Sequence, residues 1–338
     1  MSILEVRDLV YGYDSPRGFV PIVDHVDLDL AAGESLGVIG ESGSGKSSLL
    51  YAVMRILKRN TRIASGSVKF KGDDLSRISA ERLGDIRWSG MSMVFQGAMN
   101  ALNPIIRIGS ILGEAYARHH PRASRAEIRD RVQEILDLVR VPSHVRTAFA
   151  HELSGGMRQR VVIALALICH PDVLLADEPT TALDVVLQDE IMARLEEIRA
   201  KLRFGMILVS HDLALIAETS NRVMVMYAGQ IVETGAVRDV IDRPRHPYTI
   251  GLLQSYPSLQ DMQRVPISIP GSPPTPETAF RGCRFAPRCP MAEPACLDWV
   301  SELSAVEETG AAHKVRCRRV DEVDACAASL YRNQRSDA

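Results

Sequence analysis

The positions of the apolar residues along the chain predict two kinds of element. Short apolar runs of strand length occur at 35–40 (SLGVIG), 173–177 (VLLAD), 206–210 (MILVS) and 223–227 (VMVMY). Such runs are typical of strands buried on both faces of a sheet. Residues 187–202 (LQDEIMARLEEIRAKL) instead repeat their apolar residues every three or four positions, which predicts an amphipathic helix. Strands that alternate with helices predict a largely parallel α/β core.

Two further regions differ from this core. Within about 97–170, the segment SRAEIRDRVQEILDLV opens with Ser124 and Glu127 at capping-box spacing and continues at helical period, which predicts an inserted helical subdomain. After about 240 the chain becomes rich in proline (RPRHPY, IPGSPPTPE) and then in cysteine. We therefore expect a first domain over 1–240 and a C-terminal extension over 241–338.

Length and charge exclude several classes of protein. The 338 residues fit one large domain or two modest ones, and the net charge of −2 gives no signal for binding nucleic acid. The start, MSILEVRDLV, lacks the basic and apolar regions of a secretory signal. The longest apolar run, VVIALALIC, has nine residues. A bilayer-spanning helix needs about 20, so we do not expect the chain to form a membrane channel by itself.

Residues 40–47 (GESGSGKS) fit the phosphate-binding loop, or P-loop, pattern. Glycines let successive backbone N–H groups point at phosphate oxygens, and the positive end of the following helix adds to the attraction. Lys46 is expected to reach the β- and γ-phosphates, and the Ser47 hydroxyl to bind Mg²⁺. A flexible glycine turn is the alternative, but an apolar run ends at Gly40 and a helix-forming segment follows. The expected nucleotide contacts are Gly40, Ser42, Gly43, Ser44, Gly45, Lys46, Ser47 and Ser48.

Two carboxylates follow the buried run 173–177, in VLLADEP. Asp177 suits the Mg²⁺ side of a nucleotide site. On a strand Glu178 would point the opposite way, where it could polarise an attacking water. The alternative is an acidic pair solvated at the edge of a sheet.

The segment 153–160 (LSGGMRQR) predicts a second helix N-terminus that could bind an anion. Ser154, Gly155 and Gly156 precede the helix. One P-loop already accounts for one nucleotide, so a second anion site suggests a dimer in which each helix end completes the partner's site. The alternative is that Ser154 is only an N-cap.

In their order and spacing, GESGSGKS, VFQ, LSGGMRQR, VLLADEP, TTALD and VSHD resemble the nucleotide-binding domain of an ABC transporter over about residues 3–240. The resemblance implies a P-loop NTPase of ABC type, an α/β fold with a mixed sheet, an inserted helical subdomain and a small cysteine-containing extension. It also implies four roles: stacking on adenine for Tyr13 (with Tyr11 a near competitor), Mg²⁺ binding and sensing of the membrane subunit for Gln96, a dimer-interface loop for Asp184 and a γ-phosphate contact for His211. His151 and His170 lack such support and are expected to be structural.

Later segments narrow the resemblance. GAMNALNP, RHPYTIGLLQSYP and IPGSPPTP resemble the oligopeptide/dipeptide importer branch, as does GCRFAPRCPMAEPAC with HKVRC, which extends the match to about residue 320. This implies an ATPase that energises import of di- and oligopeptides; nickel, oligosaccharides and peptide-like compounds are alternative cargoes. Two ATP molecules would be held between two such subunits, which close on ATP and reopen after hydrolysis.

The branch also implies the partners and the location. We expect two membrane permeases, an extracytoplasmic binding protein and a second ATPase, either a paralogue or another copy of this chain. The chain would then be peripheral, at the cytoplasmic face of a bacterial or archaeal membrane.

Four of the six cysteines, Cys283, Cys289, Cys296 and Cys317, are separated by five, six and twenty residues. Four thiolates are the number that a four-iron four-sulfur (4Fe-4S) cluster needs, and the extension of the branch is associated with such a cluster. Zinc is an alternative, although short CxxC spacings are missing. The four thiols could also stay reduced and unligated, or form disulfides. Cys169 and Cys326 are expected not to be ligands.

Two rival function classes are compatible with an ATP-binding chain. A soluble ABC ATPase of translation or DNA repair usually has two nucleotide-binding domains or long coiled coils, which this sequence does not show. An iron–sulfur regulatory protein that uses ATP as a signal would not need Gln96, Glu178 and His211 together. Genes for membrane permeases beside this one would favour transport.

Overall fold

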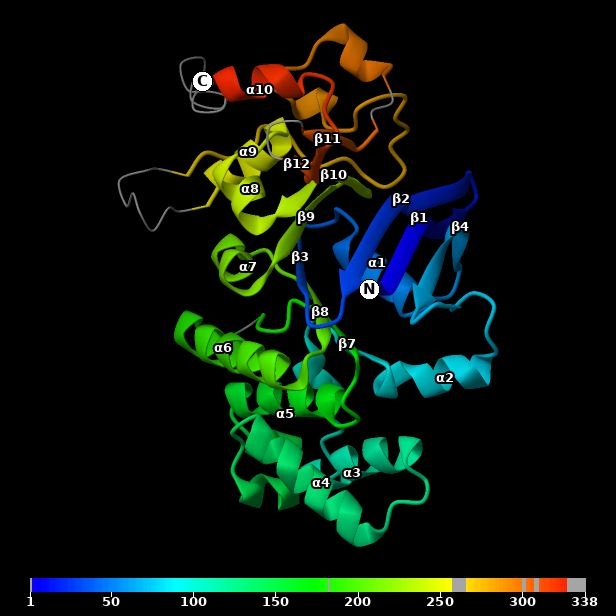
Figure 1. Ribbon diagram of the computed structural model, residues 1–338, viewed down its shortest axis with the longest axis vertical. Coiled ribbons are helices and arrows are strands. Elements are labelled where there is room, and N and C mark those ends of the chain that lie inside the picture. Colours follow the sequence, from blue (N-terminus) through cyan, green and yellow to red (C-terminus); the bar gives the residue numbers. More distant parts are fainter. Residues whose placement is uncertain (1, 182, 257–265, 300–301, 307–309, 327–338) are drawn as a thin grey trace. The chain divides into compact units, whose positions relative to one another are not determined.

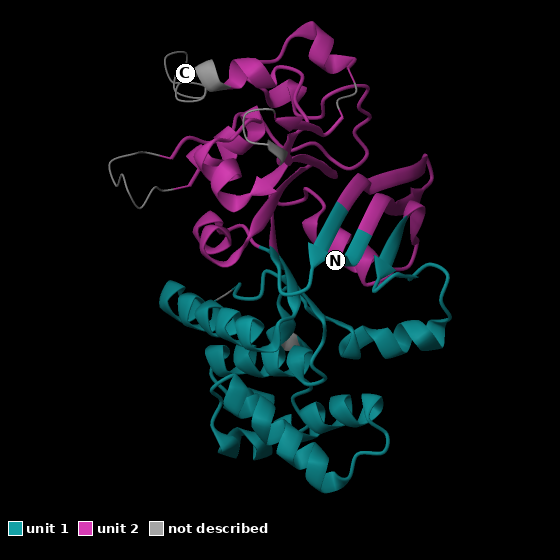
Figure 2. Ribbon diagram, in the orientation of Figure 1, with its two compact units in different colours: residues 1–5, 28–35, 67–209 teal, residues 6–27, 36–66, 210–338 magenta. Residues whose placement is uncertain are grey.

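The computed structural model describes residues 2–181, 183–256, 266–299, 302–306 and 310–326. The chain divides into two compact units (Figure 2). Unit 1 comprises residues 1–5, 28–35 and 67–209, and unit 2 comprises 6–27, 36–66 and 210–338. Four strands have residues in both units: β1 (Ser2–Ser15), β2 (Gly18–Ala31), β3 (Ser35–Ile39) and β4 (Thr61–Phe70). The short strand β5 (Asp73–Asp74) pairs with the unit 1 end of β4.

The sheet of unit 1 is parallel and fully buried. Its strands are β6 (Met91–Val94), β7 (Val173–Asp177) and β8 (Gly205–Val209). Met91 pairs with Val173, and Val173 pairs with Gly205. All residues of the three strands are buried, as the apolar runs predict for β7 and β8, so each strand can only lie inside a covered sheet.

The helices of unit 1 include the predicted helical insertion. They are α2 (Ala80–Ser89), α3 (Ile108–His119), α4 (Arg125–Leu138), α5 (Gly155–Leu167) and α6 (Val185–Leu202). Helices α3, α4 and α5 pack against one another, and α6 lies alongside α5 (Figure 1). The predicted capping box begins α4: the Ser124 hydroxyl accepts from the Glu127 N–H at 3.2 Å, and the Glu127 carboxylate accepts from the Ser124 N–H at 2.6 Å.

The sheet of unit 2 is mixed, as expected for the ABC fold. Its strands are β3 (Ser35–Ile39), β9 (Arg222–Tyr227), β10 (Gln230–Ala236), β11 (Ser304–Val306) and β12 (Gly310–Val315). Strands β3 and β9 are parallel, whereas β10 pairs antiparallel with both β9 and β12. Strand β12 pairs in turn with β11. The C-terminal extension therefore adds two strands to this sheet.

The helices of unit 2 are short. They are α1 (Lys46–Val53), α7 (Leu213–Thr219), α8 (Val237–Asp242), α9 (Pro247–Gln254) and α10 (Val320–Cys326). Helix α8 packs on β9 and β10.

A buried carboxylate fastens the extension to the sheet of unit 2. Glu233 of β10 is fully buried and accepts hydrogen bonds from the backbone N–H groups of Arg245 (2.7 Å) and His246 (3.0 Å). Its third partner is Nε2 of the buried His313 on β12, at 2.8 Å. A buried carboxylate without hydrogen-bond partners is costly, so these bonds must be kept in the folded protein. They hold β10, β12 and the segment 245–246 together.

Candidate functional site

The P-loop has the backbone that its glycines predict. Strand β3 ends at Ile39 and α1 begins at Lys46. Gly43 and Gly45 have φ angles of +80° and +106°, which favour glycine. A Cβ on Gly45 would also lie 2.6 Å from the Ile22 carbonyl oxygen, so a side chain cannot be accommodated there. The loop therefore wraps as a phosphate cradle requires.

The Lys46 side chain is held inside the loop that precedes it. Its ammonium donates to the carbonyl oxygens of Gly40 (2.8 Å) and Glu41 (2.9 Å) and contacts the Ser44 hydroxyl at 3.4 Å. Lys46 is only 8% exposed. A fixed cation with N–H groups around it is suited to phosphate oxygens.

The C-terminal extension contacts the P-loop directly, which the sequence reasoning missed. Both Arg288 guanidinium NH groups donate to the Glu41 carboxylate, at 2.7 and 3.0 Å. The Tyr248 hydroxyl accepts from the Glu41 N–H at 2.8 Å. The Glu41 carboxylate raises the pKa of Arg288, whose burial alone would lower it. Tyr248 lies in the segment RHPYTIGLL and Arg288 in the segment GCRFAPRCP. Both segments identify the family branch by their sequence, but neither predicts a contact with the P-loop.

Three aromatic rings pack behind this contact. Tyr227 and Tyr248 have ring centroids 4.6 Å apart, and Phe285 lies 5.2 and 5.3 Å from them. All three side chains are almost fully buried. Offset and edge-on aromatic pairs at these distances are favourable, so the cluster makes the support of the P-loop rigid.

In unit 1, the two predicted carboxylates differ from the expected strand alternation. Asp177 ends β7 and is fully buried, but Glu178 lies beyond the strand with a φ of +45°. The prediction that Glu178 points across a strand is therefore wrong, because the strand stops one residue earlier. The left-handed backbone at Glu178 is unusual for a non-glycine residue, and such conformations are common at functional sites.

The Glu178 carboxylate is fixed by two donors of unit 1. The Gln96 side-chain amide donates to Glu178 Oε2 at 2.8 Å, and the Thr181 hydroxyl donates to the same oxygen at 3.0 Å. The structure thus brings together two residues that the sequence proposes as catalytic. Thr181 was not singled out, although it lies in the quoted TTALD motif.

The other predicted residues of unit 1 lie at helix starts. Ser154 is the N-cap of α5 and accepts from the Met157 N–H at 3.3 Å. Asp184 is the N-cap of α6 and accepts from the Leu187 N–H at 3.0 Å. Gly156 is buried, and a Cβ there would lie 2.5 Å from the Leu187 side chain. These contacts explain why α5 and α6 begin where they do. Binding of an anion at the start of α5 stays a prediction.

The structure distinguishes the two candidate tyrosines in unit 2. Tyr11 is buried in the core with 2% of its surface exposed. Tyr13 is partly exposed, and its hydroxyl donates to the Glu277 carboxylate of the extension. Tyr13 is therefore the one that could stack on a base. His211 is exposed just before α7, whose N-cap is Asp212.

The four clustered cysteines line one cavity of unit 2, which we call the cysteine cavity. The Cys283 N–H donates to the Cys296 carbonyl at 2.9 Å. Cys169 lies in unit 1, where its thiol contacts the Ala115 carbonyl at 3.9 Å. The side chain of Cys326 lies outside the described part. None of the five described cysteines forms a disulfide.

Burial makes three of these thiols, those of Cys283, Cys289 and Cys317, poor acids. Loss of solvent raises the pKa of Cys289 and Cys317 to about 12, and it also raises the pKa of Cys283. Thiols of this kind stay protonated at neutral pH unless a metal takes the proton's place. Within the described residues, no group of three or more His, Cys, Asp or Glu side chains is arranged to hold a metal ion.

Comparison with known families matches both parts of the chain. Residues 23–181 match the ABC transporter family, and residues 232–296 match the oligopeptide/dipeptide transporter C-terminal region. The second match begins within β10 and includes three of the four clustered cysteines.

Similar proteins cover nearly the whole chain. A Brucella melitensis protein, named as a peptide import ATP-binding protein, is 46% identical over 299 residues, which are 87% of this chain and 89% of its own length. The oligopeptide transport ATP-binding protein OppD of Escherichia coli is 42% identical over 297 residues, with 87% and 88% covered.

Solved structures agree on the fold. A dimeric ABC transporter cassette, MJ0796, superposes with a TM-score of 0.63 at 26% identity, over 70% of this chain and 99% of that one. CbiO1 of Clostridium perfringens, part of an ABC transporter complex, gives a TM-score of 0.62 at 28% identity, over 72% and 91%.

The fold and the motifs define an ABC-type ATPase. The chain belongs to the ABC transporter ATP-binding subunits, in the branch that carries the oligopeptide/dipeptide transporter C-terminal region.

Proposed function

We propose that the chain binds and hydrolyses ATP to energise import of di- and oligopeptides. The observation that carries this proposal is the preformed P-loop around Lys46, in a chain whose relatives are named for peptide import. The Gln96–Glu178 hydrogen bond supports hydrolysis in addition to binding.

Each predicted residue has a proposed role in ATP hydrolysis. The P-loop, from Gly40 to Ser48, binds the phosphates, with Lys46 neutralising their charge. The proposed Mg²⁺ ligands are Ser47 and Gln96, and Asp177 is proposed to lie on the Mg²⁺ side of the site. Bound Mg²⁺ would neutralise charge on the phosphates. His211 is proposed to contact the γ-phosphate and Tyr13 to stack on adenine.

Glu178 is the proposed general base. Its Oε2 is held by Gln96 and Thr181, so the carboxylate has a fixed orientation in which its other oxygen can accept a proton from water. Fixing the base before reaction avoids the cost of orienting it during reaction.

A second nucleotide-binding subunit is the proposed partner of the α5 and α6 starts. Val185 and Val186, next to Asp184, are 72% and 80% exposed, which is unusual for two adjacent apolar residues. Together with the Ser154 helix end, they support a dimer interface. The partner is proposed to be a paralogue or another copy of this chain.

The membrane subunits are proposed to dock near Gln96. Phe95, beside it, is 37% exposed and Ile105 is 81% exposed, and we propose that these apolar side chains contact a permease. Within the described residues, no helix is both long and apolar enough to span a bilayer. We propose that the chain lies peripherally at the cytoplasmic face of the membrane, together with two permeases and an extracytoplasmic binding protein. We also propose that the first domain ends near residue 240.

We further propose that the cysteine cavity holds a 4Fe-4S cluster. Four thiols around one space provide the required donor set. Zinc would need all four sulfurs about 2.3 Å from one point, whereas a cluster spreads them because each thiolate binds a different iron. The spacings of five, six and twenty residues also lack the short CxxC pattern that is common at zinc sites. Iron and acid-labile sulfide analysis after anaerobic purification tests the cluster; zinc without sulfide would contradict it.

The transport function is tested by ATP hydrolysis in the reconstituted lipid-embedded complex with its permeases, partner ATPase and binding protein. The binding protein is loaded in turn with peptides, an oligosaccharide or nickel. We expect stimulation by peptides alone, and its loss in Glu178→Gln. Glu302→Gln, an exposed glutamate of the extension, is the matched control. Stimulation by another cargo would assign that cargo, and hydrolysis indifferent to permeases would contradict the transport role.

A further inference from the structure

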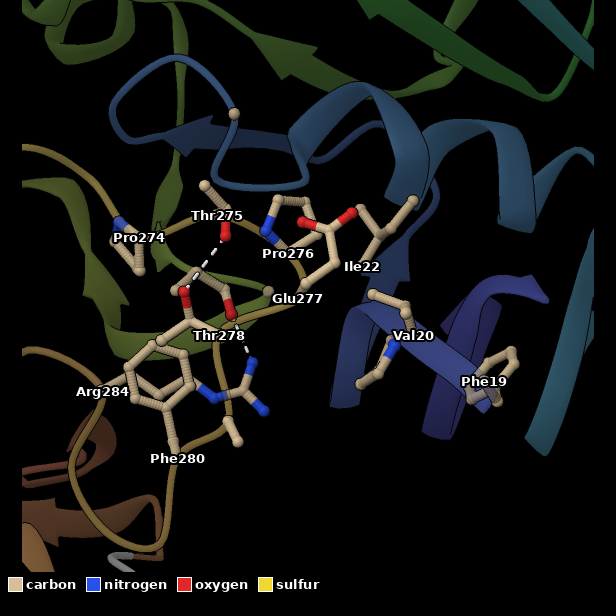
Figure 3. A pocket seen from close by; sticks show the side chains of 15 residues that line it. Phe19, Val20, Ile22, Pro274, Thr275, Pro276, Glu277, Thr278, Phe280 and Arg284 are labelled. Carbon is tan, nitrogen blue, oxygen red and sulfur yellow. Dashed lines mark hydrogen bonds between the residues drawn. The ribbon is translucent and has the colours of Figure 1, made fainter. Parts of the chain in front are cut away.

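Unit 2 contains a cavity of about 310 Å³ beside the P-loop (Figure 3). One side is formed by Phe19, Val20 and Ile22 of β2 and by Gly43 of the P-loop. The other side is formed by residues 274–280 of the C-terminal extension, which we call the extension strip. The volume lies at the lower end of the range for small-molecule sites.

The extension strip has a defined conformation. The Thr278 N–H donates to the Thr275 carbonyl at 3.0 Å, and the two threonine hydroxyls are 3.2 Å apart. These bonds close a β-turn with Pro276 and Glu277 as its central residues, and proline is favoured at the first of these positions. The turn thus presents Glu277 at its tip (Figure 3).

Apolar side chains form much of the cavity wall, beside the polar side chains of Thr275, Glu277, Thr278 and Arg284. Phe280 is held by Arg284, whose guanidinium lies 5.4 Å from the ring centroid. Arg284 is also paired with Asp24 and donates to the Ala228 carbonyl, so its charge is already compensated. Glu277 is the carboxylate in the lining. Apolar walls with a carboxylate suit a ring or sugar that donates hydrogen bonds, and the negative charge of Glu277 would repel a phosphate.

Glu277 also connects this cavity to the proposed adenine-stacking residue, because it accepts a hydrogen bond from the Tyr13 hydroxyl. Tyr13, Gly43 and Glu277 come from three separate stretches of the chain, and all belong to unit 2. The phosphate cradle and the cavity therefore adjoin within one compact unit.

We propose that the extension strip forms the nucleoside side of the nucleotide site, and that Glu277 is a specificity-determining residue that accepts a hydrogen bond from the nucleoside. The inference rests on the proposed assignment of the P-loop to ATP. The donor is either the 6-amino group of adenine or the ribose 2′-hydroxyl, both of which offer the same hydrogen-bond chemistry. The extension then takes part in recognising the nucleotide.

The experiment compares ligands with and without a nucleoside on the full-length protein. Equilibrium affinities are measured for ATP and for inorganic tripolyphosphate, which lacks the nucleoside. Glu277→Ala is expected to weaken ATP binding about tenfold, the size of one hydrogen bond to a charged group. Tripolyphosphate affinity should stay the same or rise slightly, because a nearby negative charge is removed. Glu277→Gln, which keeps a neutral acceptor, should lose less.

Two analogues identify the donor on wild-type protein. Purine riboside triphosphate lacks the amino group, and 2′-deoxy-ATP lacks one hydroxyl. The analogue that binds wild type as weakly as ATP binds Glu277→Ala names the partner of Glu277. Glu302→Ala is the control for loss of an exposed glutamate and should change no affinity.

Equal weakening of ATP and tripolyphosphate by Glu277→Ala, or no weakening of either, would overturn the inference while leaving ATP binding intact. Failure of wild type to bind ATP, or binding that survives Lys46→Ala, would instead overturn the proposed function on which the inference rests.

Discussion

The P-loop and the cysteine cavity both belong to unit 2, but they are specified in different ways. The P-loop is eight consecutive residues, and its shape follows from glycines at positive φ. The cysteine cavity gathers side chains from Cys283 to Cys317, with β11 and β12 lying between the third and fourth cysteine. One site is made by local backbone conformation, the other by tertiary packing.

The two sites are therefore sensitive to different kinds of substitution. A change at Lys46 of the P-loop should affect nucleotide binding with little effect on folding. A change at the cysteine cavity should affect the arrangement of the whole extension. Arg288 connects the two, since it lies next to Cys289 and pairs with Glu41 of the P-loop.

The largest expected effect is that of Lys46→Ala. The variant removes the only side chain of the P-loop that carries a positive charge, so ATP affinity should fall at least about 100-fold, the loss of one strong charge-assisted contact. Calorimetric titration measures it, and circular dichroism checks the fold. A parallel loss of folded structure would contradict the local character of the P-loop.

Cys317→Ser tests the distributed site. Because it removes the most distant of the four thiols, bound iron should fall from about four atoms per chain to near zero, and the melting temperature should drop by several degrees. Iron analysis and thermal unfolding measure both. Cys169→Ser, in unit 1, is the matched control and should keep the iron.

Arg288→Met tests the connection between the C-terminal extension and the P-loop. It keeps an unbranched apolar stem but leaves the Glu41 carboxylate without its bidentate partner, which should cost about 1–3 kcal/mol in the free energy of unfolding. Chemical denaturation measures the loss. The double variant with Glu41→Met should recover part of it, and no recovery would argue against a direct coupling.

The smallest expected effect is that of Ser124→Ala, a purely local change. Loss of the capping box at α4 should lower the free energy of unfolding by about 1 kcal/mol. Ser124→Asn should retain most of the stability, because asparagine is also a good N-cap. Neither change should alter ATP affinity.

Features with a local cause could be predicted from the sequence. The P-loop, the strand ending at Asp177 and the capping box at Ser124 all depend on neighbouring residues, and the structure has them where expected. The left-handed backbone at Glu178 could not be predicted, because glutamate rarely adopts a positive φ and Pro179 indicates only that the strand ends nearby.

Features that depend on distant contacts could not be predicted. The pairings of Arg288 with Glu41 and of Glu277 with Tyr13 join residues about 250 positions apart, and no periodicity or spacing encodes them. The spacing of the cysteines indicated a shared site, but only packing shows that all four reach one cavity.

The discontinuity of unit 2 has a consequence for synthesis on the ribosome. Most of unit 1 is one continuous stretch, 67–209, whereas β3 and the P-loop must wait for β9, β10 and β12. At about 5–20 residues per second, the interval from residue 66 to residue 315 lasts roughly 12 to 50 s. We therefore expect unit 1 to fold on the nascent chain before unit 2 can complete its sheet. During this interval the exposed strands of unit 2 are expected to need a chaperone until β12 has been synthesised.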